Sequence, residues 1–320
     1  MSGMSLSKST GLLAFAIVIL FCLQFVLPEY HYLSMTRIMV LAVFAMAYNL
    51  LFGYTGLLSL GHAMFFAAGL YGAGLTAYYF EWSVPLAFLA GIASGFVASL
   101  VIGVISLRTT GVAFMIVTMM FAQVAHLTAN YLTTWTRGEE GLTMPPTARS
   151  FDLAGLHFDL TDPTTRYNIA LFLLTLTTAV IFAIVRRPIG RVLIAIRENE
   201  PRTLMLGYDT FRLKLIALVA SGTLSAMAGA AYALLFGYIG STFASIQYSI
   251  EALLFTLLGG AGTILGPLIG TAAMFYMIDI ASEYTTAYLL VTGIALVLLV
   301  LYFPKGILGS IRDRWFPWIP

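Results

Sequence analysis

Cysteine and charge are the scarcest components of this 320-residue chain, and each scarcity excludes a class of protein. The one cysteine, Cys22, lies in an apolar run, which excludes a disulfide framework and a cysteine-based metal site. Charged residues make up 9% of the chain, whereas soluble domains carry roughly 25%. The low charge content therefore excludes a soluble globular protein.

The chain also lacks the residue patterns of enzymes. It contains no G-x-x-x-x-G-K-[ST] sequence, so no loop that cradles nucleotide phosphates is predicted. No spacing of His, Cys, Asp and Glu indicates a metal site, and no Ser, His and Asp arrangement indicates a nucleophile. We predict no catalytic residue, no metal and no cofactor in this chain, and no nucleic-acid partner. If ATP drives the protein, another chain binds and hydrolyses it.

Apolar sequence dominates instead: 60% of the residues are hydrophobic and the mean hydropathy is +0.94. Long apolar runs between short polar intervals are typical of an all-α polytopic membrane protein. We predict one membrane domain over 1–320 with about ten transmembrane helices, within a range of roughly eight to eleven. The predicted spans are 11–27, 33–52, 57–80, 84–107, 111–133, 168–185, 215–236, two within 249–281, and 287–303.

The distribution of cations predicts how the chain is oriented. Interval 186–214 holds seven of the sixteen Lys and Arg residues, and clustered cations stay on the cytoplasmic side. Ten crossings from a cytoplasmic N-terminus place twelve cations inside, one (Arg37) within a span, and three (Arg137, Arg149 and Arg166) outside. We therefore predict cytoplasmic termini, a periplasmic loop at 134–167, a cytoplasmic loop at 186–214 and a cytoplasmic tail at 304–320.

The cytoplasmic loop at 186–214 is also predicted to be folded. Val192, Ile196 and Leu204 lie at apolar positions of an amphipathic helix, and Gly207 is suited to end it. An ordered helix between two spans indicates a surface offered to another protein.

Glycine interrupts two apolar regions, 49–74 in the first half (1–133) and 251–270 in the second half (168–303). Five spans in each half would make an inverted-topology repeat. Transporters build their pathways from such broken segments, because unwound backbone is tolerated only where it lines a cavity or is buried in protein. The alternative is that these glycines serve close helix packing alone.

Three sequence blocks resemble one transporter family. AYNLLFGYTGLLSLGHA at 47–63 is similar to the signature of permeases of branched-chain amino-acid ABC importers. AIRENE, LGY and the small-residue span that follows, within 191–231, resemble the coupling segment of that family. Ser249 to Ala252 and LLGGAGTILGPLIG at 257–270 resemble its third block. The order and spacing of the blocks agree with the LivM-type form of the family.

The resemblance implies a subunit of a bacterial inner-membrane importer that moves leucine, isoleucine and valine by alternating access. The implied partners are a second, LivH-like permease, two cytoplasmic ATPase subunits, a periplasmic substrate-binding protein and membrane lipid. The residues implied to couple to the ATPase are Arg191, Arg197, Glu198, Asn199, Glu200 and Gly207. The residues implied to line the pathway are Asn49, Tyr54, Thr55, Gly56, Ser59, Gly61, His62, Gln123, Glu251, Gly259, Gly260, Gly262, Gly266 and Pro267.

Several of these polar residues have a structural interpretation as well. His62 fits a hydrogen bond between helices as well as a place on the pathway. Gln123, His126 and Asn130 lie on one helical face and are suited to hold helices together. Glu251 and Asp279 lie in or near apolar segments and could both sit at the outer interface.

Two other functions remain open from the sequence. A permease of the same family could carry urea, short amides or other amino acids, and nothing in the chain distinguishes these cargoes. A stand-alone ion-coupled transporter would need a buried acid at mid-membrane, for which Glu251 or Asp279 is the candidate.

Overall fold

The computed structural model describes residues 3–153, 156–287, 290–291, 293–294, 297, 301–302 and 305–314. The helices are α1 (Gly3–Leu23), α2 (Glu29–Asn49), α3 (Ala63–Tyr79), α4 (Val84–Ser106), α5 (Val112–Tyr131), α6 (Thr133–Thr136), α7 (Pro163–Arg186), α8 (Pro188–Met205), α9 (Thr210–Phe236), α10 (Ile246–Gly259), α11 (Gly266–Tyr284) and α13 (Gly306–Arg314). Shorter elements are the π-helix η1 (Leu50–Tyr54), the 3-10 helices η2 (Pro146–Arg149) and η3 (Ser241–Ala244), and strands β1 (Leu142–Thr143), β2 (Ser150–Leu153), β3 (Leu156–Asp159) and β4 (Tyr238–Ile239).

The described chain is an all-helical membrane protein. Five helical segments in it are long and apolar enough to cross a bilayer, and they are Glu29–Tyr54, Val84–Ser106, Val112–Tyr131, Pro163–Arg186 and Thr210–Phe236. The predicted spans 33–52, 84–107, 111–133, 168–185 and 215–236 coincide with these five segments. The predicted last span, 287–303, lies largely outside the described residues.

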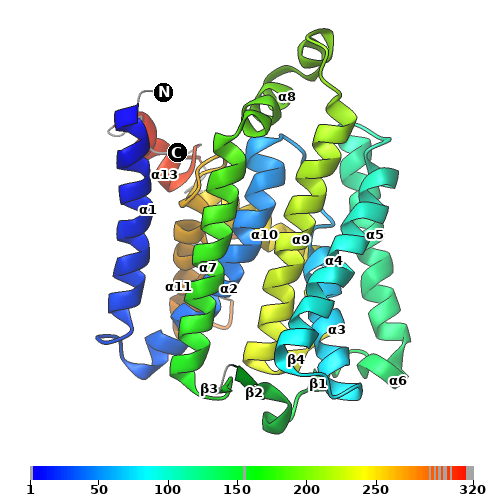
Figure 1. Ribbon diagram of the computed structural model, residues 1–320, viewed down its shortest axis with the longest axis vertical. Helices are drawn as coiled ribbons and strands as arrows, with labels where there is room; N and C mark the ends of the chain where they lie inside the picture. Colours follow the sequence, from blue (N-terminus) through cyan, green and yellow to red (C-terminus); the bar gives the residue numbers. More distant parts are fainter. Residues whose placement is uncertain are drawn as a thin grey trace.

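The two ends of the bundle differ (Figure 1). The N-terminus, α8 and α13 lie at one end, which we name the α8 end. The short strands and α6 lie at the other, which we name the strand end. There β1 pairs with β4 and β2 pairs with β3, both antiparallel. The long helices run between the two ends.

Small residues bring α3, α4 and α9 into close contact, as the sequence predicts. A Cβ on Gly69 of α3 would overlap the backbone of Ala226 on α9, and one on Gly229 of α9 would overlap the backbone of Phe66. A Cβ on Gly91 of α4 would lie 2.7 Å from the carbonyl oxygen of Gly69. Such approaches are possible only where side chains are absent or small, and they hold helices together in lipid.

The predicted helix over 57–80 is wrong in its first part. Residues 55–62 are not helical, and α3 begins at Ala63. The reason is tertiary: the Ala63 amide donates to the Ser249 hydroxyl of α10 over 2.8 Å. A side chain from another helix therefore satisfies a backbone donor that a longer helix would have satisfied internally.

The predicted break within 249–281 is confirmed, with α10 ending at Gly259 and α11 beginning at Gly266. A Cβ on Gly259 would overlap the backbone of Gly266, so the two helix ends meet closely. Pro267 occupies the first turn of α11, where a missing N–H costs no helical hydrogen bond.

A buried arginine closes the strand end of α9. Arg149 donates from Nε to the carbonyl of Leu234 (3.0 Å) and from Nη2 to those of Leu235 (2.6 Å) and Leu160 (3.2 Å). The first two are carbonyls of the last helical turn, which have no intrahelical donor. Burial lowers the pKa of the Arg149 guanidinium, and the three carbonyls offset this desolvation.

Arg149→Met is expected to destabilise the protein by about 3 kcal/mol, because it leaves buried carbonyls without a donor. The thermal unfolding midpoint of the detergent-purified protein measures this loss. Arg137→Met is the control, since Arg137 is exposed and its hydrogen bond to the Tyr78 hydroxyl is long, at 3.4 Å. Equal midpoints for the two variants would contradict the capping role.

Candidate functional site

The loop predicted to couple to a partner folds as α8, but α8 is broken in two. Asn199 has an extended backbone (φ −161°, ψ 96°) between two helical segments. Its side-chain oxygen accepts from the amide of Arg202 over 2.9 Å, which caps the second segment, and Pro201 stands in the first turn of that segment. The prediction of one amphipathic helix is therefore corrected to two short helices with a break at Asn199.

Arg197, at the end of the first segment, reaches into the membrane domain. Its guanidinium donates to the carbonyl of Gly53, in η1 at the end of α2. A Cβ on Gly56 would lie 3.0 Å from Cγ of Arg197, and Gly56 has a φ of +78° that favours glycine. The absence of a side chain at Gly56 is what lets Arg197 approach.

The second glycine-broken region, 251–270, contacts Asn49 and Arg197 at the same place. Asn49 donates to the carbonyl of Thr263 over 2.8 Å and accepts from the amide of Gly262 over 2.9 Å. A Cβ on Gly262 would lie 3.1 Å from Nη1 of Arg197. We name Asn49, Gly53, Arg197, Gly262 and Thr263 the glycine junction. It joins α8 to both broken regions at the α8 end.

The C-terminal helix lies beside the glycine junction. Arg312 of α13 lies 3.4 Å from the Gly262 carbonyl to which it donates. Gly260 has a φ of +120°, and a Cβ there would lie 2.8 Å from the amide nitrogen of Gly309. The loop between α10 and α11 is therefore held between α2, α8 and α13.

The second segment of α8 is tied to α9 by an ion pair. Lys214 lies 2.6 Å from Glu200, and its side chain is only 6% exposed. A cavity of about 450 Å³ opens beside this pair, lined by residues 55–57 and 196–201, by Gly111 and by Lys214. Glu200 thus makes a contact within the chain, and the same is true of Arg197 and Asn199.

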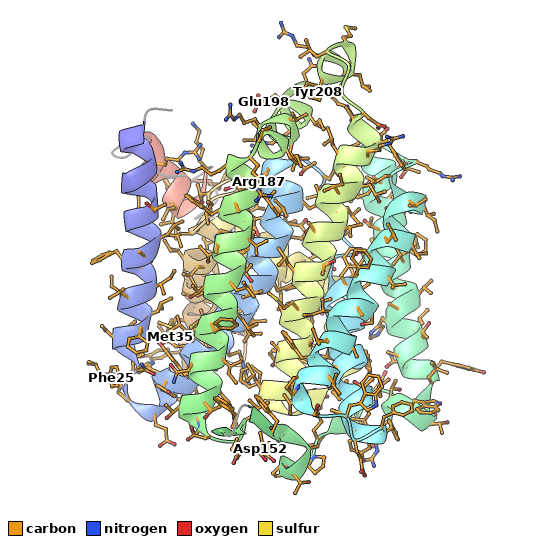
Figure 2. All side chains as sticks on the ribbon, in the orientation of Figure 1. Phe25, Met35, Asp152, Arg187, Glu198 and Tyr208 are labelled. Atoms are coloured by element: carbon orange, nitrogen blue, oxygen red, sulfur yellow. The ribbon has the colours of Figure 1, made fainter. Side chains whose placement is uncertain are left out.

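The outermost part of α8 is apolar and exposed. Met205 is 87% exposed and Leu206 is 72% exposed, and Leu204 and Tyr208 beside them are also exposed. Figure 2 shows Tyr208 near the tip of the α8 end, with Glu198 at the same end. Gly207 ends the segment with a φ of +88°, which confirms its predicted role as a cap.

His62 is fully buried in packing between helices. Its Nε2 lies 3.0 Å from the Ser221 hydroxyl of α9, and its ring packs against Phe44, Tyr48 and Phe65. The structure thus gives His62 the role of a hydrogen-bonding partner between helices.

The stripe on α5 also holds helices together. Nδ1 of His126 lies 2.9 Å from the carbonyl of Ser241 in η3, and Asn130 lies 3.2 Å from His126 Nε2. Gln123, on the same face, is half-buried.

The remaining predicted residues fall into three groups. Tyr54, Thr55 and Ser59 are buried, and a Cβ on Gly61 would overlap the backbone of Thr118. Arg191 and Glu198 are exposed on α8. Gln123 and Glu251 lie outside the glycine junction.

An internal repeat shows what the sequence analysis missed. AYNLLFGYTG at 47–56 and AYALLFGYIG at 231–240 share eight of ten residues. The first copy ends α2 at the α8 end, and the second ends α9 at the strand end (Figure 1). Each copy is contacted by an arginine from another element: Arg197 of α8 contacts Gly53, and Arg149 of η2 contacts the carbonyls before Gly237.

Comparison with known proteins decides the family. The model of the family described as "Branched-chain amino acid transport system / permease component" matches residues 32–302. The chain belongs to this permease family. The permease is therefore a transport subunit and not itself an enzyme, and its ABC-type family relies on separate ATPase and binding-protein partners.

Curated relatives of the permease agree with this assignment. It is 28% identical over 304 residues to the high-affinity branched-chain amino acid transport system permease protein LivM of Escherichia coli, and 27% identical to that of Salmonella typhimurium. Each alignment covers 87% of the permease and 70% of the relative. The ribose import permease protein RbsC of Haemophilus influenzae is 28% identical over 155 residues, which are 44% of this chain and 46% of that one.

One solved structure shares the fold. It is described as an inward-facing conformation of a metal-chelate type ABC transporter, and it superposes with a TM-score of 0.50 at 16% identity. The match covers 93% of the permease and 98% of the solved chain. It is evidence for the fold and not for the cargo.

Proposed function

We propose that the permease forms part of the translocation pathway for branched-chain amino acids and is driven by ATPase subunits that act on α8. The observation that carries the proposal is the glycine junction, where Arg197 of α8 contacts Gly53 and lies against Gly262. A displacement of α8 would move the ends of both broken regions together. Alternating access needs such a mechanical connection between the site of ATP hydrolysis and the pathway.

The α8 end is proposed to face the cytoplasm, with both termini on that side. The cations of 186–214 support this orientation. The repeat at 47–56 and 231–240 supports two inverted halves of five spans, because the helices that it ends run in opposite directions. Helices α1, α3, α10 and α11 and the predicted span 287–303 would then complete the ten spans.

The exposed tip of α8 is proposed to dock on an ATPase. Met205 and Leu206 are apolar and stand in solvent, which is unfavourable unless a partner covers them. Arg197, Glu200 and Asn199 make contacts within the chain, so they transmit the displacement and the tip receives it.

Met205→Asp with Leu206→Asp is expected to weaken the association with the ATPase by at least about 30-fold, roughly 2 kcal/mol, because two apolar contacts are replaced by charge. Co-purification of the ATPase with tagged permease measures the association. Tyr131→Asp, on an equally exposed residue near the strand end, is the control. Full co-purification of the double variant would place docking elsewhere.

Branched-chain amino acids are the proposed cargo because the LivM proteins align along most of the permease. The partial alignment with a ribose permease keeps other cargoes as outcomes of the test. The proposed assembly includes a second, LivH-like permease and a periplasmic binding protein.

The proposal as a whole is tested by ATP-driven uptake in proteoliposomes that contain the assembled complex. Leucine, isoleucine and valine are offered against urea, short amides and ribose. Uptake by the purified permease alone, driven by a proton or sodium gradient, would overturn the proposal in favour of an ion-coupled carrier. Of the two candidate acids for such a carrier, Asp279 accepts a 2.6 Å hydrogen bond from Tyr30 near the strand end, which favours the interfacial interpretation.

A further inference from the structure

Two opposite charges lie within membrane helices without a partner. Arg37 is about two helical turns from the start of α2, and Glu251 is in the second turn of α10. Within the part of the chain that the structure describes, neither side chain forms a hydrogen bond or an ion pair. Unpaired charges at such positions are costly, so they are usually retained for function.

An aromatic surface connects the two charges. The Arg37 guanidinium lies 5.6 Å from the ring centre of Phe236, at the end of α9. Tyr248 is one turn before Glu251 on α10, and its ring centre lies 5.1 Å from that of Phe243. The rings of Phe243 and Tyr232 lie 4.8 Å apart.

The side chains of Arg37 and Glu251 lie near the same aromatic rings, and both are at least partly exposed at the molecular surface. Phe236, over which the Arg37 guanidinium lies, packs on Tyr232 with ring centres 4.7 Å apart, and Tyr232 leads through Phe243 to Tyr248, one turn from Glu251. Arg37 is exposed and Glu251 is half-buried. The alternative is that the Arg37 side chain only extends to the membrane–water interface. That alternative leaves the unpaired carboxylate of Glu251, beside the same aromatic rings, unexplained.

We propose that Arg37 and Glu251 bind the charged head group of a zwitterionic amino acid on its way through the permease. Arg37 receives the carboxylate, Glu251 receives the ammonium group, and the rings of Phe236, Phe243 and Tyr248 accept the apolar side chain. This inference rests on the proposed function and adds the residues that hold the head group of the cargo. A neutral sugar or urea would leave both charges unpaired.

Substrate protection from thiol reagents tests the site directly. Cys22 is the single cysteine, so Cys22→Ser provides a background in which Arg37→Cys or Glu251→Cys is the sole thiol. In the reconstituted complex, saturating leucine with its binding protein and ATP is expected to slow labelling at both positions by about fivefold or more. Tyr131→Cys, exposed on α5, is the control whose labelling leucine does not change. Equal rates with and without leucine at positions 37 and 251 would overturn the proposal.

Charge neutralisation gives a second measurement. Arg37→Gln and Glu251→Gln are each expected to lower leucine uptake about tenfold or more, the loss of one charge-assisted contact. Arg37→Lys keeps the charge and is expected to retain more uptake than Arg37→Gln. Arg137→Gln, in the strand-end loop, and Asp279→Asn, whose carboxylate is held by Tyr30, are the matched controls.

The outcomes separate this site from the proposed function. If the unaltered complex takes up no amino acid with ATP, the proposed function fails. If it takes up leucine with ATP but Arg37→Gln and Glu251→Gln behave like their controls, only the zwitterion site fails.

Discussion

Arg197→Ala is expected to reduce ATP-driven uptake by the assembled complex at least about tenfold, while the ATPase subunits stay bound and hydrolyse ATP. Arg197 donates to Gly53 and lies against Gly262, so it is the contact through which α8 meets both broken regions. Alanine removes the guanidinium and leaves the exposed tip of α8 in place. Hydrolysis would then continue without moving the pathway.

Paired measurements of uptake and ATPase activity test this expectation. If Arg197 instead contacted the ATPase, Arg197→Ala would lose co-purifying ATPase, as the Met205 and Leu206 variant is expected to do. Arg202→Ala is the control, because Arg202 is an exposed arginine on the second segment of α8. Uptake at the level of the unaltered complex would show that the glycine junction does not transmit movement.

Gly260→Leu is expected to prevent assembly of the folded permease. Gly260 combines a φ of +120° with a ψ of 100°, a backbone conformation that residues with a Cβ rarely adopt. A Cβ would also lie 2.8 Å from the Gly309 amide and 3.1 Å from the Lys305 carbonyl, so α13 would have to move. Strain and overlap together are expected to cost about 3 kcal/mol or more.

The yield of monodisperse protein in detergent and its thermal midpoint measure this effect. Gly11→Leu is the control, since a Cβ on Gly11 meets nothing within 4 Å. Gly260→Ala has the same backbone strain with less overlap and is expected to fall between the two. A Gly260→Leu protein with normal yield and midpoint would show that the loop between α10 and α11 tolerates a different path.

The glycine junction shows what the sequence motifs could predict and what they could not. The blocks around Gly53, Arg197 and Gly262 were recognisable, and their glycines indicated close approach. Their meeting at one point was not predictable, because Asn49 and Thr263 are 214 positions apart in the sequence. No local pattern encodes which of the close approaches a folded chain will make.

Composition and the pattern of apolar runs determined that this protein is a helical membrane protein, and the missing P-loop motif predicted that it has no nucleotide site. Hydrophobic spans and glycine breaks are local properties, because each span must satisfy its own backbone in lipid. The resemblance of three blocks led to the family that comparison then confirmed. The charge of 186–214 predicted an exposed, folded loop, and α8 is that loop.

Only the tertiary structure decided what the polar residues do. Arg197 and Glu200 could have faced a partner, yet they contact Gly53 and Lys214, and Ser249 of α10 sets where α3 begins. Arg37 and Glu251 came to the same aromatic surface only through the packing of α2 against α9 and α10. Such contacts depend on which helix faces meet, and that choice is made by the packing of the whole bundle.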